Sequence, residues 1–310
     1  MKLSQHRILT THVGSLPRSE EVFKLVFAKE AGEKIDMNHY DRVISEAVQT
    51  VVRNQTDVGV DVVSDGEQSK ISYATYIKHR LNGFDGDSPR RTPKDLEEYP
   101  AFSKRASSSG GVPTYSRPQC VGPISVKDLK PLEVDLQNFK DALSVSEATD
   151  AFMNAASPGV IAQFQPNQHY PDHSSYLYAL ADAMKVEYEA IAEAGLVIQI
   201  DSPDLALGRH VLFKDHSDEE FVAMAELHIE ALNHALQNIP AEQLRLHVCW
   251  GNYQGPHHCD IEMKIILPAV LKAKPMALSF EGANPRHSHE WSVFRDAKIP
   301  ENKVLIPGVL

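Results

Sequence analysis

Apolar and polar residues alternate along the chain in one recurring unit. The unit is an amphipathic helix, then a glycine, then a short apolar strand that ends in polar residues. In its first copy, apolar residues spaced three and four apart predict a helix, Gly59 suits the left-handed residue after it, and VDVVSDGE is the strand. Copies run from about Asn38 to Glu67, from Ser174 to Asp204, from Ser217 through RLHVCWGN, and from Ile261 through MALSFEG. This alternation predicts an α/β fold with a parallel sheet and helical crossovers.

The apolar segments predict a TIM-type (β/α)8 barrel with one strand fewer than its usual eight. Expected strands are RILTTHVG, VDVVSDGE, SPGVIAQF, LVIQIDSPD, RLHVCWGN, MALSFEG and KVLIPGVL. An open doubly wound sheet is the alternative, but no glycine-rich phosphate loop follows the first strand. We therefore expect one barrel domain over residues 1–310 with seven of eight strands. The eighth strand would be missing because the sequence is truncated at its C-terminal end.

Residues 85–118 interrupt the alternation. The segments SPRRTPKDLEEYP and KRASSSGGVPTYSRP are rich in proline, serine, glycine and charge, which is typical of loops. We expect this insertion to be a loop or hairpin excursion from the barrel, with PQCVGPISV as one of its strands.

Charge and cysteine content narrow the class of protein. The net charge is −11, which argues against nucleic acid as a partner because phosphate binding requires a basic face. The start of the chain lacks the apolar core of a signal peptide, and no apolar run is long enough for a membrane span. Three scattered cysteines make no disulfide framework. We expect a cytoplasmic protein without membrane contacts; the sequence leaves open whether it forms an oligomer.

Polar residues cluster where the predicted strands end. They are His12, Gly14, Ser15, Asp65, Glu67, Asp201, Asp204, His247, Cys249 and Glu281. The carboxyl ends of parallel strands meet on the face of a barrel that carries active sites. The clustering therefore predicts an enzyme.

The pair His247 and Cys249 indicates a metal site. Residues two apart on a strand point to the same side, so an imidazole and a thiolate would aim at one point. Zinc favours nitrogen and sulfur ligands, and Glu281 at the next strand end would add an oxygen. The alternative is a buried cysteine beside a hydrogen-bonded histidine.

Other candidates have a structural interpretation beside the functional one. Asp65, Glu67 and Asp201 would hold an ammonium group or cap the following helices. Gly14 and Ser15 would present backbone N–H groups to a carboxylate or form a tight turn. We expect Cys259, in GPHHCD, to lie away from the metal. We expect His287 and His289 to face solvent or cap a helix.

These motifs together resemble the catalytic C-terminal barrel of the cobalamin-independent methionine synthase family, in its short single-domain form. The matching segments follow the family's order over nearly the whole chain: LTTHVGSLPR, GVDVVSDGE, AASPGV, AGLVIQIDSPDLA, LHVCWGN and LSFEGANPR. The resemblance implies that His247, Cys249 and Glu281 bind Zn²⁺, with a further cysteine expected beyond Leu310. It also implies that Glu67 and Asp201 bind the amino group of homocysteine, and that Gly14 and Ser15 contact its carboxylate.

The activity implied is zinc-dependent methyl transfer to the thiol of homocysteine, which would make methionine. The methyl donor would be a methyl-folate or another carrier, including a methyl-corrinoid. Three alternatives stay open at this stage. They are an epoxide:coenzyme M type of thiol alkyltransferase, a barrel like uroporphyrinogen decarboxylase, and a non-catalytic protein that binds zinc or a thiol.

Overall fold

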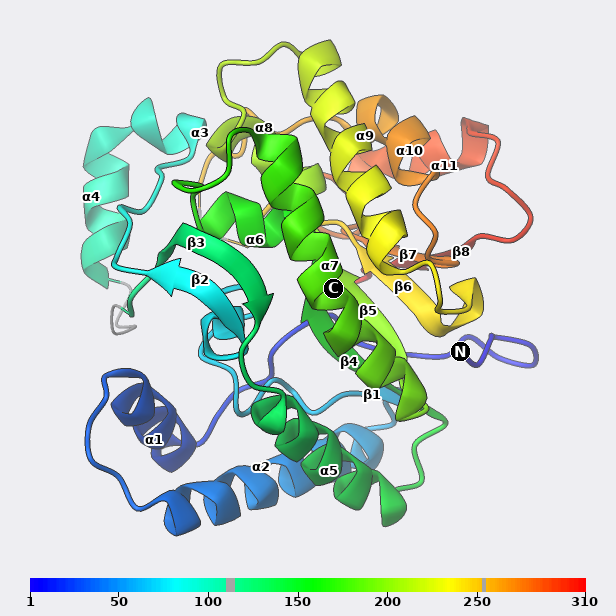
Figure 1. Cartoon of the computed structure of the whole chain (residues 1–310). Coiled ribbons are helices and arrows are strands. Elements are labelled where there is room, and N and C mark those ends of the chain that lie inside the picture. The colour runs from blue at the N-terminus through cyan, green and yellow to red at the C-terminus, as the bar shows by residue number, and fades with distance from the viewer. Residues whose placement is uncertain (110–114, 253–254) are drawn as a thin grey trace.

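The computed structural model describes residues 1–109, 115–252 and 255–310. Its centre is a curled parallel sheet (Figure 1). The strands, in spatial order, are β1 (Val62–Val63), β4 (Asp150–Ala156), β5 (Val197–Asp201), β6 (Leu244–His247), β7 (Ala277–Phe280) and β8 (Val304–Pro307). The first predicted strand contributes one parallel bridge, from Thr11 to Val62, at the β1 edge. The prediction of a partial TIM-type barrel is thus confirmed.

The helices of the four repeated units form where the apolar spacing predicts them. They are α2 (Met37–Asp57), α7 (His173–Glu193), α9 (Asp218–Ala235) and α10 (Met263–Val270). Around them lie α1 (Glu20–Glu30), α5 (Lys130–Ser144), α8 (Gly208–Val211) and α11 (Trp291–Asp296), with short 3-10 turns η1 (Thr75–His79), η2 (Pro203–Leu205), η3 (Ala241–Gln243) and η4 (Ser288–Glu290). Gly59 and Gly195 follow α2 and α7 with φ of 85° and 82°. Across the described residues we find no helix with the length and apolar character needed to span a bilayer.

The prediction of a strand at SPGVIAQF is wrong. This segment forms helix α6 (Pro158–Phe164), and the strand is the preceding segment, β4. Ser157 caps the helix by accepting a hydrogen bond from the N–H of Val160 at 2.9 Å, and Pro158 occupies the first turn. Both residues favour a helix start, and an apolar run this short does not distinguish a helix from a strand.

The excursion is partly a hairpin and partly helical. Strand β2 (Leu81–Asp85) pairs antiparallel with β3 (Gln119–Val126), as expected for PQCVGPISV. Between them lie α3 (Lys94–Glu97) and α4 (Pro100–Ser109), so the expectation of a loop is wrong for these residues (Figure 1). Residues 110–114 of the predicted insertion lie outside the described part of the chain. The hairpin packs against α7 through β3, and the excursion therefore lies outside the central sheet.

A polar layer fills the interior of the curled sheet. Asn154, Gln199 and Arg245 are register partners on β4, β5 and β6, and each is at most 1% exposed. Arg245 donates from Nε to Oε1 of Gln199 at 2.7 Å, which satisfies both buried groups. Two residues further along, Asp201 and His247 are register partners on the same face. The strand register thus brings Asp201 and His247 together at the carboxyl ends of the sheet.

Gly159 in α6 is expected to tolerate no side chain. A Cβ there would lie 2.0 Å from Oδ2 of Asp204 and 2.4 Å from Nδ1 of His228. Those atoms pair with each other at 2.8 Å, and both side chains are 1% exposed. Gly159→Ala should therefore destabilise the fold by about 3 kcal/mol, measured by urea unfolding. Gly14→Ala is the control, since a Cβ at Gly14 has no neighbour within 4 Å. Equal stability of the two variants would contradict this prediction.

Candidate active site

One pocket of about 540 Å³ gathers the site residues predicted from the sequence. Those in its lining are Gly14, Ser15, Glu67, Asp201, His247, Cys249 and Glu281. Asp201 and His247 are the last residues of β5 and β6, and Glu281 follows β7 directly. The pocket therefore lies at the carboxyl ends of the strands, on the face where barrel enzymes carry their active sites.

Asp201 holds His247 in a defined orientation. Nδ1 of His247 lies 3.0 Å from Oδ1 of Asp201. The carboxylate also accepts hydrogen bonds from Nε2 of Gln199 at 2.8 Å and from Nδ2 of Asn154 at 2.9 Å. Burial alone would lower the pKa of His247, but its hydrogen bonds to Asp201 and Cys249 raise it to about 10. With Nδ1 directed at a carboxylate, Nε2 is the ring nitrogen left to face the pocket.

Cys249 lies between His247 and Glu281. Its Sγ is 3.8 Å from Oε1 of Glu281 and accepts the N–H of Gly251 at 3.2 Å. Glu281 is itself fixed, because Oε1 accepts the N–H of Trp250 at 3.3 Å and Oε2 accepts Nδ2 of Asn284 at 2.6 Å. Asp201 thus orients His247, Trp250 and Asn284 orient Glu281, and Cys249 contacts both His247 and Glu281.

The three side chains suit a zinc ion by chemistry. They offer one nitrogen, one sulfur and one oxygen ligand, and the carboxylate behind His247 is the usual outer partner of a zinc-bound histidine. The ligand atoms of His247, Cys249 and Glu281 do not all lie within 4.8 Å of one another. Among the described residues, the group that meets this limit is Glu98, His258 and Cys259. Binding by all three would therefore require the side chains to move closer together.

The N-terminal segment is tied to the loop that carries Glu67. Nη2 of Arg18 donates to the carbonyl oxygens of Glu67 and Lys70, both at 2.6 Å. The N–H of Leu16 donates to the carbonyl oxygen of Gly66 at 3.1 Å. These bonds place Gly14 and Ser15 on the same pocket wall as Glu67.

Glu67 occupies a strained and buried position. Its φ is 55°, a conformation uncommon outside glycine, and its N–H donates to Oδ1 of Asp65 at 3.1 Å. Burial is the main cause that raises the pKa of its carboxyl group from 4.5 to about 7; Asp201 and Asp65 add to this, while Lys70 and Arg18 oppose it. Strain and an elevated carboxyl pKa in a pocket are both features of functional sites.

Three strand-end residues do not line the pocket. Nε2 of His12 pairs with Oε1 of Gln55 at 2.7 Å. Asp65 accepts the Glu67 N–H, and Asp204 accepts the hydroxyl of Ser157 at 2.8 Å. These residues support local structure, so their position at strand ends alone does not mark them as site residues.

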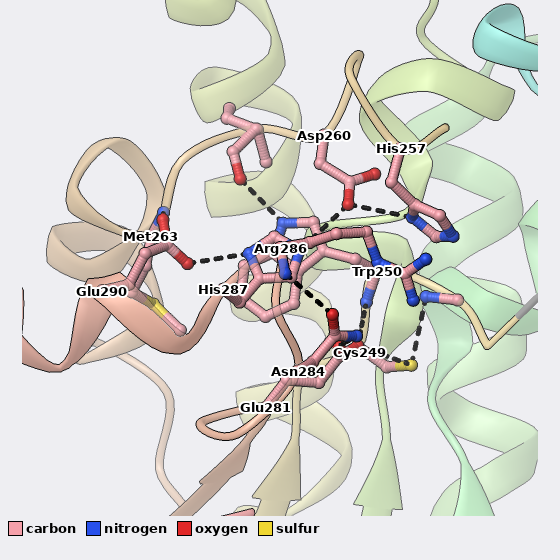
Figure 2. A network of polar contacts seen from close by, with 12 residues as sticks. Cys249, Trp250, His257, Asp260, Met263, Glu281, Asn284, Arg286, His287 and Glu290 are labelled. Atoms are coloured by element: carbon pink, nitrogen blue, oxygen red, sulfur yellow. Dashed lines mark hydrogen bonds and ion pairs between the residues drawn. The ribbon is translucent and has the colours of Figure 1, made fainter. Parts of the chain in front are cut away.

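His287 does not face solvent, since the residue is only 4% exposed; it stands at the N-cap position of η4, but its side chain makes no capping hydrogen bond. Its Nε2 pairs with Oδ2 of Asp260 and its Nδ1 with Oε2 of Glu290, both at 2.9 Å (Figure 2). Its ring stacks on Trp250 at 4.2 Å between centroids. Asp260 also accepts Nδ1 of His257 at 3.0 Å. This network joins the loop after Cys249 to the loop after Glu281. His289 is exposed, as expected.

Sequence reasoning also missed several pocket residues. Tyr73, Asn252, Asn284 and Arg286 line the pocket as well. Asn284 and Arg286 follow Glu281 on the same strand-end loop, which is the signal that could have identified them. The i,i+3 pairs His257 with Asp260 and His287 with Glu290 could likewise have indicated the network.

Comparisons with known proteins find similarity to methionine synthases. The family described as the catalytic domain of cobalamin-independent synthases matches residues 8–89. The methionine synthase of Saccharolobus solfataricus is 27% identical over 274 residues, which is 87% of this chain and 72% of that protein. The methionine synthase of Sulfurisphaera tokodaii is 28% identical over 245 residues, 79% of this chain and 62% of that protein.

Solved structures show the same fold. A B12-independent methionine synthase from Shewanella sp. W3-18-1, in complex with selenomethionine, has a TM-score of 0.65 and 19% identity, covering 89% of this chain and 72% of that one. A putative vitamin-B12 independent methionine synthase from Listeria monocytogenes has a TM-score of 0.64 and 18% identity, covering 98% and 81%. The chain thus spans between about three fifths and four fifths of the proteins it matches. These matches support the resemblance of this chain to the cobalamin-independent methionine synthases.

Proposed function

We propose that this chain transfers a methyl group to the sulfur of homocysteine, with Zn²⁺ held by His247, Cys249 and Glu281. The observation that carries the proposal is a single pocket lined by a nitrogen, a sulfur and an oxygen ligand and by two further carboxylates. The names of the relatives support the same reaction. A thiol substrate and a methyl donor are therefore the small-molecule partners.

The amino-acid part of the substrate fits the acidic part of the pocket that Glu67 and Asp201 line. The carboxylates of Glu67 and Asp201 are both buried, and an ammonium group would offset their mutual repulsion through charge-assisted hydrogen bonds. Backbone N–H groups at Gly14 and Ser15 suit the substrate carboxylate. Coenzyme M has no ammonium group, so this acidic pair favours an amino-acid thiol over coenzyme M.

The chemistry follows from how these residues hold the reactants. Bound zinc supplies positive charge that keeps a thiol ionised at neutral pH, where a free thiol is mostly protonated. Because Nδ1 of His247 is paired with Asp201, Nε2 is the ring nitrogen that would bind the metal once its proton is released. Trp250 and Asn284 fix the Glu281 carboxylate. A substrate held at both ends would attack the methyl group in an effectively intramolecular geometry.

A thiol and donor screen tests the proposal. The zinc-loaded chain would be incubated with homocysteine or coenzyme M, each with methyl-tetrahydrofolate or methylcobalamin, and the S-methylated product measured. We expect methionine from at least one donor, and methylated coenzyme M at a rate lower by at least about 100-fold, because the acidic pair would remain unpaired. Comparable rates for both thiols, or no methionine with either donor, would contradict it.

Glu67 is expected to lower the stability of the folded chain at high pH while it contributes to substrate binding. The pKa of the Glu67 carboxyl group is about 7 in the folded chain and 4.5 in the unfolded chain. The contribution of this group to the free energy of unfolding is therefore fully present below pH 4.5 and is lost as the pH rises through 7. Glu67→Gln should therefore stabilise the chain by about 3 kcal/mol at pH 8 and by much less near pH 5, measured by urea unfolding.

The same substitution should raise KM for homocysteine at least tenfold at pH 8, since the ammonium loses a charged partner. The control is Glu193→Gln, at the end of α7 and outside the pocket, which should change neither quantity. A stability gain that does not depend on pH would contradict the elevated pKa of Glu67.

A further inference from the structure

The geometry points to a second cation site, formed by Glu98, His258 and Cys259. One ligand atom from each residue lies within 4.8 Å of the other two. Among the residues that the structure describes, these three are the histidine, cysteine and acidic residues whose ligand atoms lie within 4.8 Å of one another. We propose that it binds Zn²⁺ or a cation of similar chemistry, separately from the pocket.

The site joins two segments that are far apart in the sequence. Glu98 directly follows the short helix α3 of the excursion, and His258 and Cys259 lie in the loop between β6 and α10. Nε2 of His258 lies 2.7 Å from Oε2 of Glu98, and the ring of Tyr99 meets the ring of His258 edge-on at 5.8 Å. None of the three proposed ligands lines the pocket of about 540 Å³.

Buried bonds beside the site hold both segments in place. Oδ2 of Asp95, on α3, accepts the N–H of His257 at 3.0 Å, and Asp95 is fully buried. The His257 ring is fixed in turn by Asp260, which belongs to the network of Figure 2. Asp95 lies one helical turn before Glu98, and His257 directly precedes His258. The bonds of Asp95 and His257 therefore hold the backbone that carries the proposed ligands, without using the ligand side chains.

The ligand types and the local charge both favour a divalent cation. Nitrogen, sulfur and oxygen are the ligand atoms that zinc prefers, and the exposure of Glu98 and His258 leaves room for water as a fourth ligand. Burial and then the carboxylates of Glu98 and Asp95 raise the pKa of the Cys259 thiol, and Lys94 only partly opposes them. A bound cation would reverse this electrostatic penalty and stabilise the thiolate.

A cation at this site would fasten the excursion to the loop that follows Cys249. Zinc stoichiometry of the full-length chain tests the proposal: the protein is dialysed against Zn²⁺, and bound metal is measured by elemental analysis. The variants are Cys259→Ser, Glu98→Gln and Cys249→Ser. The matched control is Glu97→Gln, because Glu97 neighbours Glu98 but pairs with Lys214 at 2.7 Å.

We expect Cys259→Ser to lose one equivalent of zinc in both the wild-type and the Cys249→Ser background. Glu98→Gln should lower the affinity for that zinc ion by about tenfold or more, and Glu97→Gln should leave the affinity unchanged. Cobalt added to the Cys249→Ser chain should give a thiolate-to-cobalt absorption band that Cys259→Ser removes. Unchanged stoichiometry in Cys259→Ser, or no such band, would overturn the proposal whether or not the pocket binds zinc.

Discussion

Replacing Cys249 with alanine is expected to lower kcat for methyl transfer to homocysteine by roughly three orders of magnitude or more and to release zinc from the pocket. The thiolate is the central one of the three proposed ligands, since Cys249 contacts both His247 and Glu281. Its loss would leave one nitrogen and one oxygen ligand, which bind zinc weakly. Activity would be measured as methionine formed, and zinc by elemental analysis.

The control for this variant is Cys120→Ser. Cys120 is a buried free cysteine on β3 whose Sγ lies 3.4 Å from the carbonyl oxygen of Gly122, a contact that a serine hydroxyl can reproduce. It should retain activity and metal. A Cys249→Ala chain that keeps its full zinc content would show that Cys249 is not a ligand, and the proposed mechanism would fail with it.

Asp201→Asn is expected to lower kcat/KM for homocysteine by about 10² to 10³. The carboxylate accepts hydrogen bonds from Asn154, Gln199 and His247, whereas an asparagine side chain offers one acceptor oxygen and directs N–H groups at a donor. His247 would lose the partner that fixes its orientation, and the substrate ammonium would lose one carboxylate. Zinc affinity should fall by about 10- to 100-fold.

Asp182→Asn is the matched control, because Asp182 pairs with Nε2 of His234 at 2.7 Å on the exposed surface of α7. It removes an aspartate–histidine pair outside the pocket and should change neither kcat/KM nor zinc affinity. If Asp201→Asn and Asp182→Asn behaved alike in a steady-state assay, Asp201 would have no role in binding or positioning.

The helices of the four repeated units could be predicted because their apolar faces repeat with the helical period, and α2 and α7 are each followed by a glycine. The same reasoning failed at Ser157 to Phe164, where a short apolar run fits a strand as well as a helix. There the capping residue and the proline were the better evidence, because they act on the backbone directly. In the excursion, the composition is typical of loops and therefore did not indicate α3. Asp95 of α3 is buried against the loop between β6 and α10.

The gathering of the candidate residues in one pocket was predictable where it depends on strand ends. Glu67, Asp201, His247, Cys249 and Glu281 come together because parallel strands place their carboxyl ends on one face. His287 could not be assigned this way, since its burial depends on Trp250 and Asp260, which reach it only after two loops have packed together. The sequence alone does not distinguish a buried charged residue in a loop from an exposed one, because the burial depends on tertiary contacts.

Zinc X-ray absorption spectroscopy shows which atoms bind the metal in the pocket. It is best done on the Cys259→Ser chain with one equivalent of zinc, where Cys249 is the only thiol among the proposed ligands. We expect one sulfur scatterer at about 2.3 Å together with nitrogen and oxygen, and a second sulfur when homocysteine is added. A coordination shell of nitrogen and oxygen alone, unchanged by homocysteine, would contradict it.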